Sequence, residues 1–214
     1  MISMIKAFFL IFEPGVGWER IARARRGFAF ILGVHLLPMI LLATAAEGWG
    51  LAHWGKWQSR FEKLKEAKDF SLAGILTFEG IQALLFLAMV CLSALLLLKI
   101  SETFQNRRSY LEAFTTMAYG FSPMFAARLL DAGPMVHPAV SWILGMVLTF
   151  WILYQGIPHV MQPDPTHAFG VYFSTMFVVV LTSGLARVFT AMYLLGYVDF
   201  KHSWLTHKFP SLFQ

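Results

Sequence analysis

The chain has 214 residues, of which 57% are hydrophobic and 14% charged, and its mean hydropathy is +0.61. Soluble domains carry about 25% charged residues, so the composition argues against a soluble domain and favours helices surrounded by lipid. The formal charge is +5, but the basic residues mainly flank apolar runs, as they do beside membranes. We therefore expect no nucleic-acid binding. The single cysteine, Cys91, excludes an internal disulfide and a cysteine-based metal site.

Residues 1–26 predict an N-terminal segment at the membrane interface. The stretch Met1–Phe12 is apolar but too short to cross a bilayer. Pro14-Gly15-Val16-Gly17 is expected to break it from the arginine-rich stretch Trp18–Arg26. The basic region before the first long apolar run is longer than a cleavable secretory signal uses. We expect both pieces to stay on the chain and to lie on the membrane surface.

Runs with few charges predict five transmembrane helices. The third run is the weakest, because Gly120 and Pro123 interrupt it and Arg128 falls in its last turn. The sequence therefore predicts an all-α, five-helix integral membrane domain over residues 27–198, followed by a tail over 199–214. The five predicted helices are Gly27–Ala46, which Glu47 follows, Gly80–Leu98, Ala113–Leu130, Pro138–Val160 and Ala168–Gly196.

The first loop and the C-terminal tail carry the candidate interface residues. In the loop over Trp54–Phe70, the side chains of Trp54, Trp57 and Phe61 recur at spacings of three and four, which predicts an amphipathic helix on the membrane surface. The tail is rich in aromatic residues, including Trp204. We expect these residues to contact lipid or a partner protein.

The balance of basic residues on the two sides hardly decides the orientation. Arg20, Arg23, Arg25 and Arg26 stand directly before the first helix, which favours a cytoplasmic N-terminus. The lysines of the first loop alternate with acidic residues on a surface helix that could rest on either leaflet.

Four stretches of the sequence, rich in glycine, proline and aromatic residues, carry a resemblance to a known family: Glu13-Pro14, Trp18-Glu19-Arg20-Ile21, Ala118-Tyr119-Gly120-Phe121-Ser122-Pro123 and Leu153-Tyr154-Gln155-Gly156-Ile157-Pro158. They resemble the Yip-domain family of small polytopic membrane proteins. The resemblance implies a five-helix membrane fold, and eukaryotic members of the family interact with Rab-type GTPases. This chain lacks their long polar N-terminal region and is more similar to short prokaryotic members, which implies a bacterial cytoplasmic membrane.

Arg187 is the most distinctive single residue, because a guanidinium within hydrocarbon costs about 2.5–3.5 kcal/mol on insertion scales unless it finds a partner or water. Its candidate partners are Asp131, which lies one turn from Arg128, and then Glu79 and Glu112. We favour a structural ion pair over a transport site. The helix breaks at Gly120, Pro123, Gly156 and Pro158 allow a transport site, but Gly and Pro are also common in membrane helices for packing.

The histidines predict no cofactor. His35 is the one histidine at mid-span, and a haem held by two histidines needs a second at matching depth, which is not evident. His159, Asp164 and His167 could together hold a divalent ion, although such a segment is more often only a turn. Sequence motifs for catalysis are also lacking.

These patterns predict a non-catalytic scaffold or accessory subunit that packs against other integral membrane proteins and lipids. The alternative is a small solute or ion carrier that uses Arg187 and Asp131. A carrier needs a cavity that water can reach around Arg187, whereas a scaffold needs only a closed pair.

Overall fold

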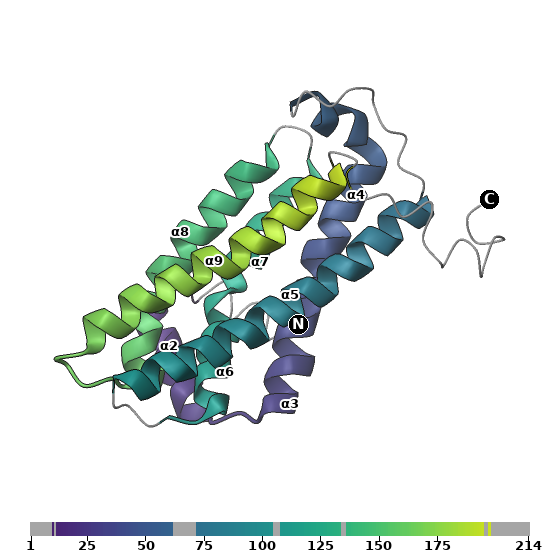
Figure 1. Cartoon of the computed structure of the whole chain (residues 1–214). Helices are drawn as coiled ribbons and strands as arrows, with labels where there is room; N and C mark the ends of the chain where they lie inside the picture. Colours follow the sequence, from purple (N-terminus) through teal and green to yellow (C-terminus); the bar gives the residue numbers. More distant parts are fainter. Residues whose placement is uncertain are drawn as a thin grey trace.

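A computed structural model describes residues 10, 12–61, 72–104, 108–133, 136–194 and 197. The described residues form helices and connecting turns without any strand, so the predicted all-α fold is confirmed. The long helices lie along one another in an elongated bundle (Figure 1). The elements are α2 (Pro14–Ala24), α3 (Phe28–Phe30), η1 (Ile31–Leu36), α4 (Leu37–Phe61), α5 (Leu72–Thr103), α6 (Tyr110–Gly120), α7 (Ser122–Ala127), η2 (Arg128–Ala132), α8 (Pro138–Gly156), η3 (Ile157–Met161) and α9 (Ala168–Leu194).

Within the described part of the chain, four helices are long and apolar enough to cross a membrane. The predicted end of the first one at Glu47 is wrong, because helix α4 continues without a break to Phe61. Glu47 therefore lies inside a candidate span, where it is 4% exposed. The four candidate spans are Phe28–His53, Gly74–Thr103, Ala139–Met161 and Ala168–Met192.

The predicted third helix, Ala113–Leu130, is a chain of three short helical pieces, α6, α7 and the 3-10 helix η2. The break falls at Phe121, just before Pro123, which lacks the backbone N–H that would continue α6. The count of five long spans is therefore not confirmed. The pieces are nevertheless almost wholly buried, and irregular backbone at membrane depth is tolerated where protein surrounds it.

We call the three pieces α6, α7 and η2 together the broken segment. It connects two opposite ends of the bundle. At one end Arg108 donates to Gln162 over 2.9 Å, and we call this the arginine end because Arg25 and Arg26 also lie there. At the other end Asp131 packs on Gly50 of α4. We call the latter the cluster end, for the charged residues described below.

The break that the sequence predicted over Pro14–Gly17 lies one residue earlier, at Glu13, which is not helical, and helix α2 begins at Pro14. Pro14 stands in the first turn of α2, where its missing N–H is harmless, so the helix runs through Gly15 and Gly17 into Trp18. Trp18 is fully buried, and its indole Nε1 donates to the backbone oxygen of Ile152 over 2.9 Å. Helix α2 is therefore fixed to α8 through the protein core.

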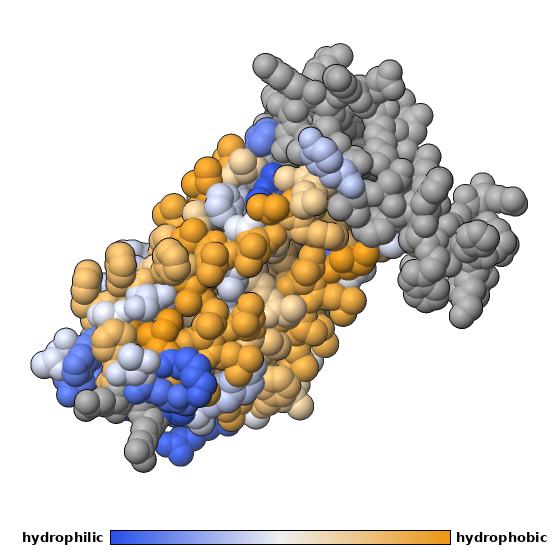
Figure 2. Space-filling view, in the orientation of Figure 1, coloured by the Kyte–Doolittle hydropathy of each residue, from blue (hydrophilic) through white to orange (hydrophobic). Residues whose placement is uncertain are grey.

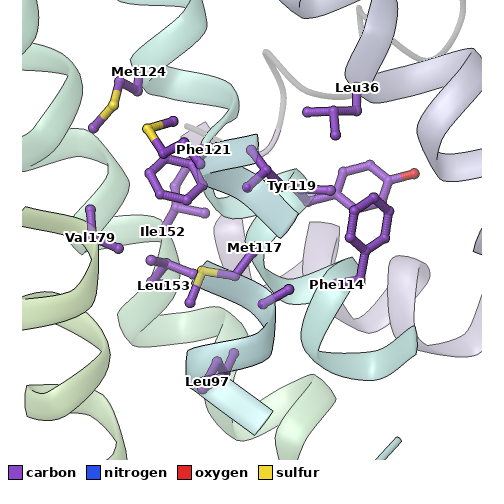
Figure 3. Close-up of a cluster of buried hydrophobic side chains, with 14 of the residues drawn as sticks. Leu36, Leu97, Phe114, Met117, Tyr119, Phe121, Met124, Ile152, Leu153 and Val179 are labelled. Atoms are coloured by element: carbon purple, nitrogen blue, oxygen red, sulfur yellow. The ribbon is translucent and has the colours of Figure 1, made fainter. Parts of the chain in front are cut away.

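The core lies around the broken segment. Met117 of α6, Met124 of α7 and Phe121 between these helices pack with Ile152 and Leu153 of α8 (Figure 3). Apolar residues cover the visible flank of the bundle, and hydrophilic residues gather at the end where α9 begins, which is the arginine end (Figure 2). This distribution is that of a membrane protein, with lipid around the flank and water at the ends.

The candidate interface residues lie at or beyond the edge of the described structure. The backbone of Trp54, Trp57 and Phe61 continues α4, so the predicted surface helix does not begin separately at Trp54. Their side chains, the rest of the first loop and Trp204 lie outside what the structure describes.

Candidate functional site

A buried polar cluster occupies the cluster end of the bundle. Glu47, Glu79 and Arg187 each lie within two helical turns of the end of a candidate span, so they meet at one depth although they are far apart in sequence. Every segment that runs along the bundle contributes to the cluster. Its members are Glu47 from α4, Glu79 and Gln82 from α5, Arg128 and Asp131 from η2, Ser141 from α8, and Arg187 and Thr190 from α9.

The centre of the cluster is an ion pair between Arg128 and Glu47. The exposed fractions of the two side chains are 7% and 5%. The amide nitrogen of Gln82 donates to the same Glu47 carboxylate over 3.2 Å. The Arg128 guanidinium also lies 4.7 Å from the centre of the Phe86 ring. Charge, hydrogen bonds and a cation–π contact together offset part of the penalty for burying this guanidinium.

Asp131 connects the cluster to α8 and α4. The Ser141 hydroxyl donates to the Asp131 carboxylate over 2.5 Å. A Cβ atom at Gly50 would lie only 2.2 Å from the backbone oxygen of Asp131, so α4 and η2 touch through their backbones. This close approach requires the glycine, and it brings Glu47 beside Arg128.

Two polar residues of α5, Gln82 and Glu79, differ in their hydrogen bonding. The Gln82 amide nitrogen donates to the Thr190 hydroxyl over 3.0 Å, which links α5 to α9. The two Glu79 carboxyl oxygens are buried without a hydrogen-bond partner among the described residues. Gln82 therefore bridges Glu47 and Thr190, whereas the Glu79 side chain packs on Gly48 of α4, where a Cβ atom would lie 3.2 Å from its Cγ.

The structure brings Arg187 to the same end as Arg128 and Asp131, and the charges of both arginines act on the Asp131 carboxylate. A direct pair between Arg187 and Asp131 stays a prediction. Glu112, another proposed partner, lies at the arginine end, where it forms a capping box with Ser109. Arg187 also borders a cavity of about 10 Å³, shared with Arg128 and Trp142. Such a volume is about that of a single water position.

Sequence reasoning missed four members of the cluster: Glu47, Gln82, Ser141 and Thr190. The charge of Glu47 predicted the end of the first span, and no motif singled out Gln82, Ser141 or Thr190. Of the four, Glu47 carried a usable signal, because a charged residue inside a long apolar helix implies a partner at the same depth.

The predicted helix breaks serve close packing. A Cβ atom at Gly156 would lie 2.4 Å from the Trp18 ring, and one at Gly120 would lie 2.4 Å from the Leu153 side chain. Pro123 occupies the first turn of α7, and Pro158 stands in the first turn of the π-helix η3. The structure thus assigns the two glycines to helix contacts.

The histidines that the structure describes contact protein groups, some of them far away in the chain. His35 Nε2 lies 2.9 Å from the Ser122 hydroxyl, and its ring stacks on Tyr119 with centroids 4.0 Å apart. Hydrogen bonds from the backbone N–H and hydroxyl of Thr166 hold the pKa of Asp164 below its usual range. Among the described residues, no group of three or more His, Cys, Asp or Glu side chains could hold a metal ion.

A sequence model of the Yip1 domain matches residues 8–187, which is well over half of the chain. The chain belongs to the Yip1 domain family. The resemblance seen in the sequence is thereby confirmed at the level of the family, and the Yip1 domain includes every charged residue of the buried cluster. No curated protein and no solved structure gives a significant match. The Yip1 domain here is an integral membrane unit of apolar helices.

Proposed function

We propose that this Yip1-domain protein is a non-catalytic scaffold or accessory subunit that associates with other integral membrane proteins. Its location is the cytoplasmic membrane of a bacterium, with the N-terminus in the cytoplasm. The observation that carries the proposal is the closed state of the buried cluster. Glu47 and Arg128 neutralise each other, and the neighbouring cavity of about 10 Å³ has no room for a solute.

The competing function is a carrier that moves a solute or ion past Arg187 and Asp131. Such a site needs a polar cavity near the middle of the membrane. Arg187 instead lies near one end of its span, where the cavity is lined by Phe86, Met89 and other apolar side chains besides the two arginines. This geometry favours a structural role for the charged residues.

Helix α9 offers the outer surface best suited to a partner. Phe169, Phe173 and Phe177 are 75%, 65% and 67% exposed, and they follow one another at a spacing of four. Side chains at this spacing form a ridge that fits the groove of another helix. We name these three residues the phenylalanine ridge.

Replacing the phenylalanine ridge by alanine is expected to reduce the amount of co-purifying membrane protein at least about tenfold, if the ridge is an interface hot spot. The measurement is quantitative mass spectrometry after purification in mild detergent. The thermal stability of the isolated chain should stay nearly unchanged, because the three side chains are mostly exposed.

A matched control replaces three exposed apolar residues of α8, Val140, Ile143 and Val147, which are 55%, 51% and 57% exposed. Equal losses in both variants would contradict a specific interface on α9.

A flux assay tests the carrier function. Proteoliposomes with an enclosed pH-sensitive dye should leak protons no faster than protein-free vesicles. Flux that Arg187→Leu abolishes in a stably folded variant would establish the carrier instead.

We also propose that the chain crosses the membrane five times, with the broken segment as the third crossing. Support comes from its path between the two ends of the bundle and from its burial among the four long helices. With five crossings, the arginine end faces the cytoplasm and the cluster end faces the opposite side, as the positive-inside rule favours.

Cysteine labelling tests this topology. In a Cys91→Ala background, Thr103→Cys and Gly133→Cys flank the broken segment at opposite ends of the bundle. A membrane-impermeant maleimide added to intact cells should label Gly133→Cys alone, and both should react after the membrane is opened. Labelling of both positions from outside would reject the five-crossing topology.

A further inference from the structure

The arginine end contains a pocket of about 340 Å³, much larger than the cavity beside Arg187. It lies between the end of α2, the start of α6 and the end of η3. Arg25 and Arg26 directly precede one candidate span, and Gln162 directly follows another. The pocket is therefore at the level of the membrane–water boundary, where lipid head groups lie.

Three guanidiniums line this pocket: those of Arg25, Arg26 and Arg108. Arg26 donates to the Tyr119 hydroxyl over 3.4 Å and lies 4.7 Å from the Phe30 ring, which orients its side chain. Arg108 donates to Gln162 over 2.9 Å. Neighbouring protein groups thus hold two of the three guanidiniums in place.

One acidic residue, Glu112, also lines the pocket. Its carboxylate already accepts hydrogen bonds from the backbone N–H and the hydroxyl of Ser109, over 2.9 and 3.1 Å, and lies 3.6 Å from Arg108. A single carboxylate cannot neutralise three guanidiniums, so the lining keeps an excess of positive charge. His159 also lines the pocket, and its Nδ1–H donates to the backbone oxygen of Gln155 over 2.7 Å.

The backbone around the pocket is unusual at two points. Among the described residues, Arg25 and Gln162 are the two non-glycine residues with positive φ, at 39° and 41°. Such conformations cost free energy and concentrate at ligand sites. Both residues line this pocket, and the two turns aim Arg25 and Gln162 toward one space.

We propose that this pocket binds a phosphate group, and specifically the head group of an anionic phospholipid. Guanidiniums bind phosphate oxygens through paired hydrogen bonds. The remaining lining includes Ile21, Leu111 and Val160, which suit the apolar part of a lipid. The depth of the pocket favours lipid over soluble phosphate.

The test uses the purified full chain in mild detergent with phosphatidylglycerol or phosphatidylcholine, and native mass spectrometry counts the retained lipid. The triple variant Arg25→Gln, Arg26→Gln and Arg108→Gln is expected to bind phosphatidylglycerol at least about tenfold more weakly, since charge-assisted hydrogen bonds are lost. Phosphatidylcholine binding should be weak in both proteins.

The matched control removes three other positive charges near the same end, through Arg20→Gln, Arg23→Gln and Lys99→Gln. It should change phosphatidylglycerol binding less than about twofold if the pocket is specific. Equal weakening in both triple variants would overturn the proposal in favour of a diffuse surface charge.

Two further experiments test the pocket without removing its charges and identify the ligand. Ala22→Leu keeps every charge but fills part of the pocket, so it should also weaken binding, and unchanged binding would contradict the site. Inorganic phosphate serves as the competitor. Displacement of the lipid only at large excess supports a lipid head group, whereas displacement at equal concentration keeps the phosphate site but assigns it to soluble phosphate.

Discussion

The substitution Arg128→Met is expected to lower the free energy of unfolding by about 3–5 kcal/mol, the loss typical of breaking a buried ion pair. The reason is Glu47, whose carboxylate would stay buried at 5% exposure without its counter-charge. The Gln82 amide would remain as a hydrogen-bond donor to this carboxylate. Unfolding by denaturant in mixed micelles measures the effect.

A double-mutant cycle isolates the pair. Adding Glu47→Gln to Arg128→Met removes the stranded charge, so the double variant should be more stable than Arg128→Met alone. Arg23→Met is the matched surface control, because the side chains of Arg23 and Glu19 are 76% and 54% exposed and such pairs contribute about 0–1 kcal/mol. A destabilisation by Arg128→Met no larger than that of Arg23→Met would refute a structural role for the cluster.

Removing the Trp18 side chain is expected to destabilise the protein by about 3–5 kcal/mol, the range for large-to-small changes of aromatic core residues. Trp18 is fully buried, rests on Gly156 and donates to the Ile152 backbone oxygen. In Trp18→Ala this oxygen loses its indole donor and α2 loses its anchor. Hydrogen exchange should accordingly rise throughout α2 while it stays low in α5.

Gly156→Ala tests the same contact from the other side. Its Cβ atom would lie 2.4 Å from the Trp18 ring, so the ring must move. Gly80→Ala is the control, since nothing lies within 4 Å of its Cβ position, and it should slightly stabilise α5 through helix propensity. If both alanines had the same effect, the close contact between α2 and α8 would be wrong.

The sequence was sufficient for the apolar helices but not for the places where tertiary packing overrides a local signal. Glu47 looked like the end of a helix because a lone carboxylate is unfavourable in lipid, yet a guanidinium from a distant segment makes its burial possible. Pro14 and its glycines looked like a break, yet the interruption is confined to Glu13, because a proline in the first turn starts a helix. At Glu47 the deciding contact lies far away in the chain, whereas at Pro14 it is the local position of the proline.

For the candidate site, the sequence indicated Arg128, Asp131 and Arg187 because charges within apolar runs are conspicuous. Gln82, Ser141 and Thr190 were not recognisable, since uncharged polar residues occur in many membrane helices without a special role. The pocket at the arginine end was equally hidden. It depends on the left-handed turns at Arg25 and Gln162, which no residue type there announces.

The hydrogen bond from Trp18 to the backbone oxygen of Ile152 also constrains when α2 can dock during synthesis. The indole and its acceptor, Ile152, are 134 positions apart, so at ribosomal speeds of about 5–20 residues per second the acceptor emerges roughly 7–27 s later. During that interval Tyr119 of α6, whose ring lies 6.4 Å from that of Trp18, becomes available to α2, but the acceptor on α8 does not. We therefore expect the docking of α2 to be completed only after α8 has been made.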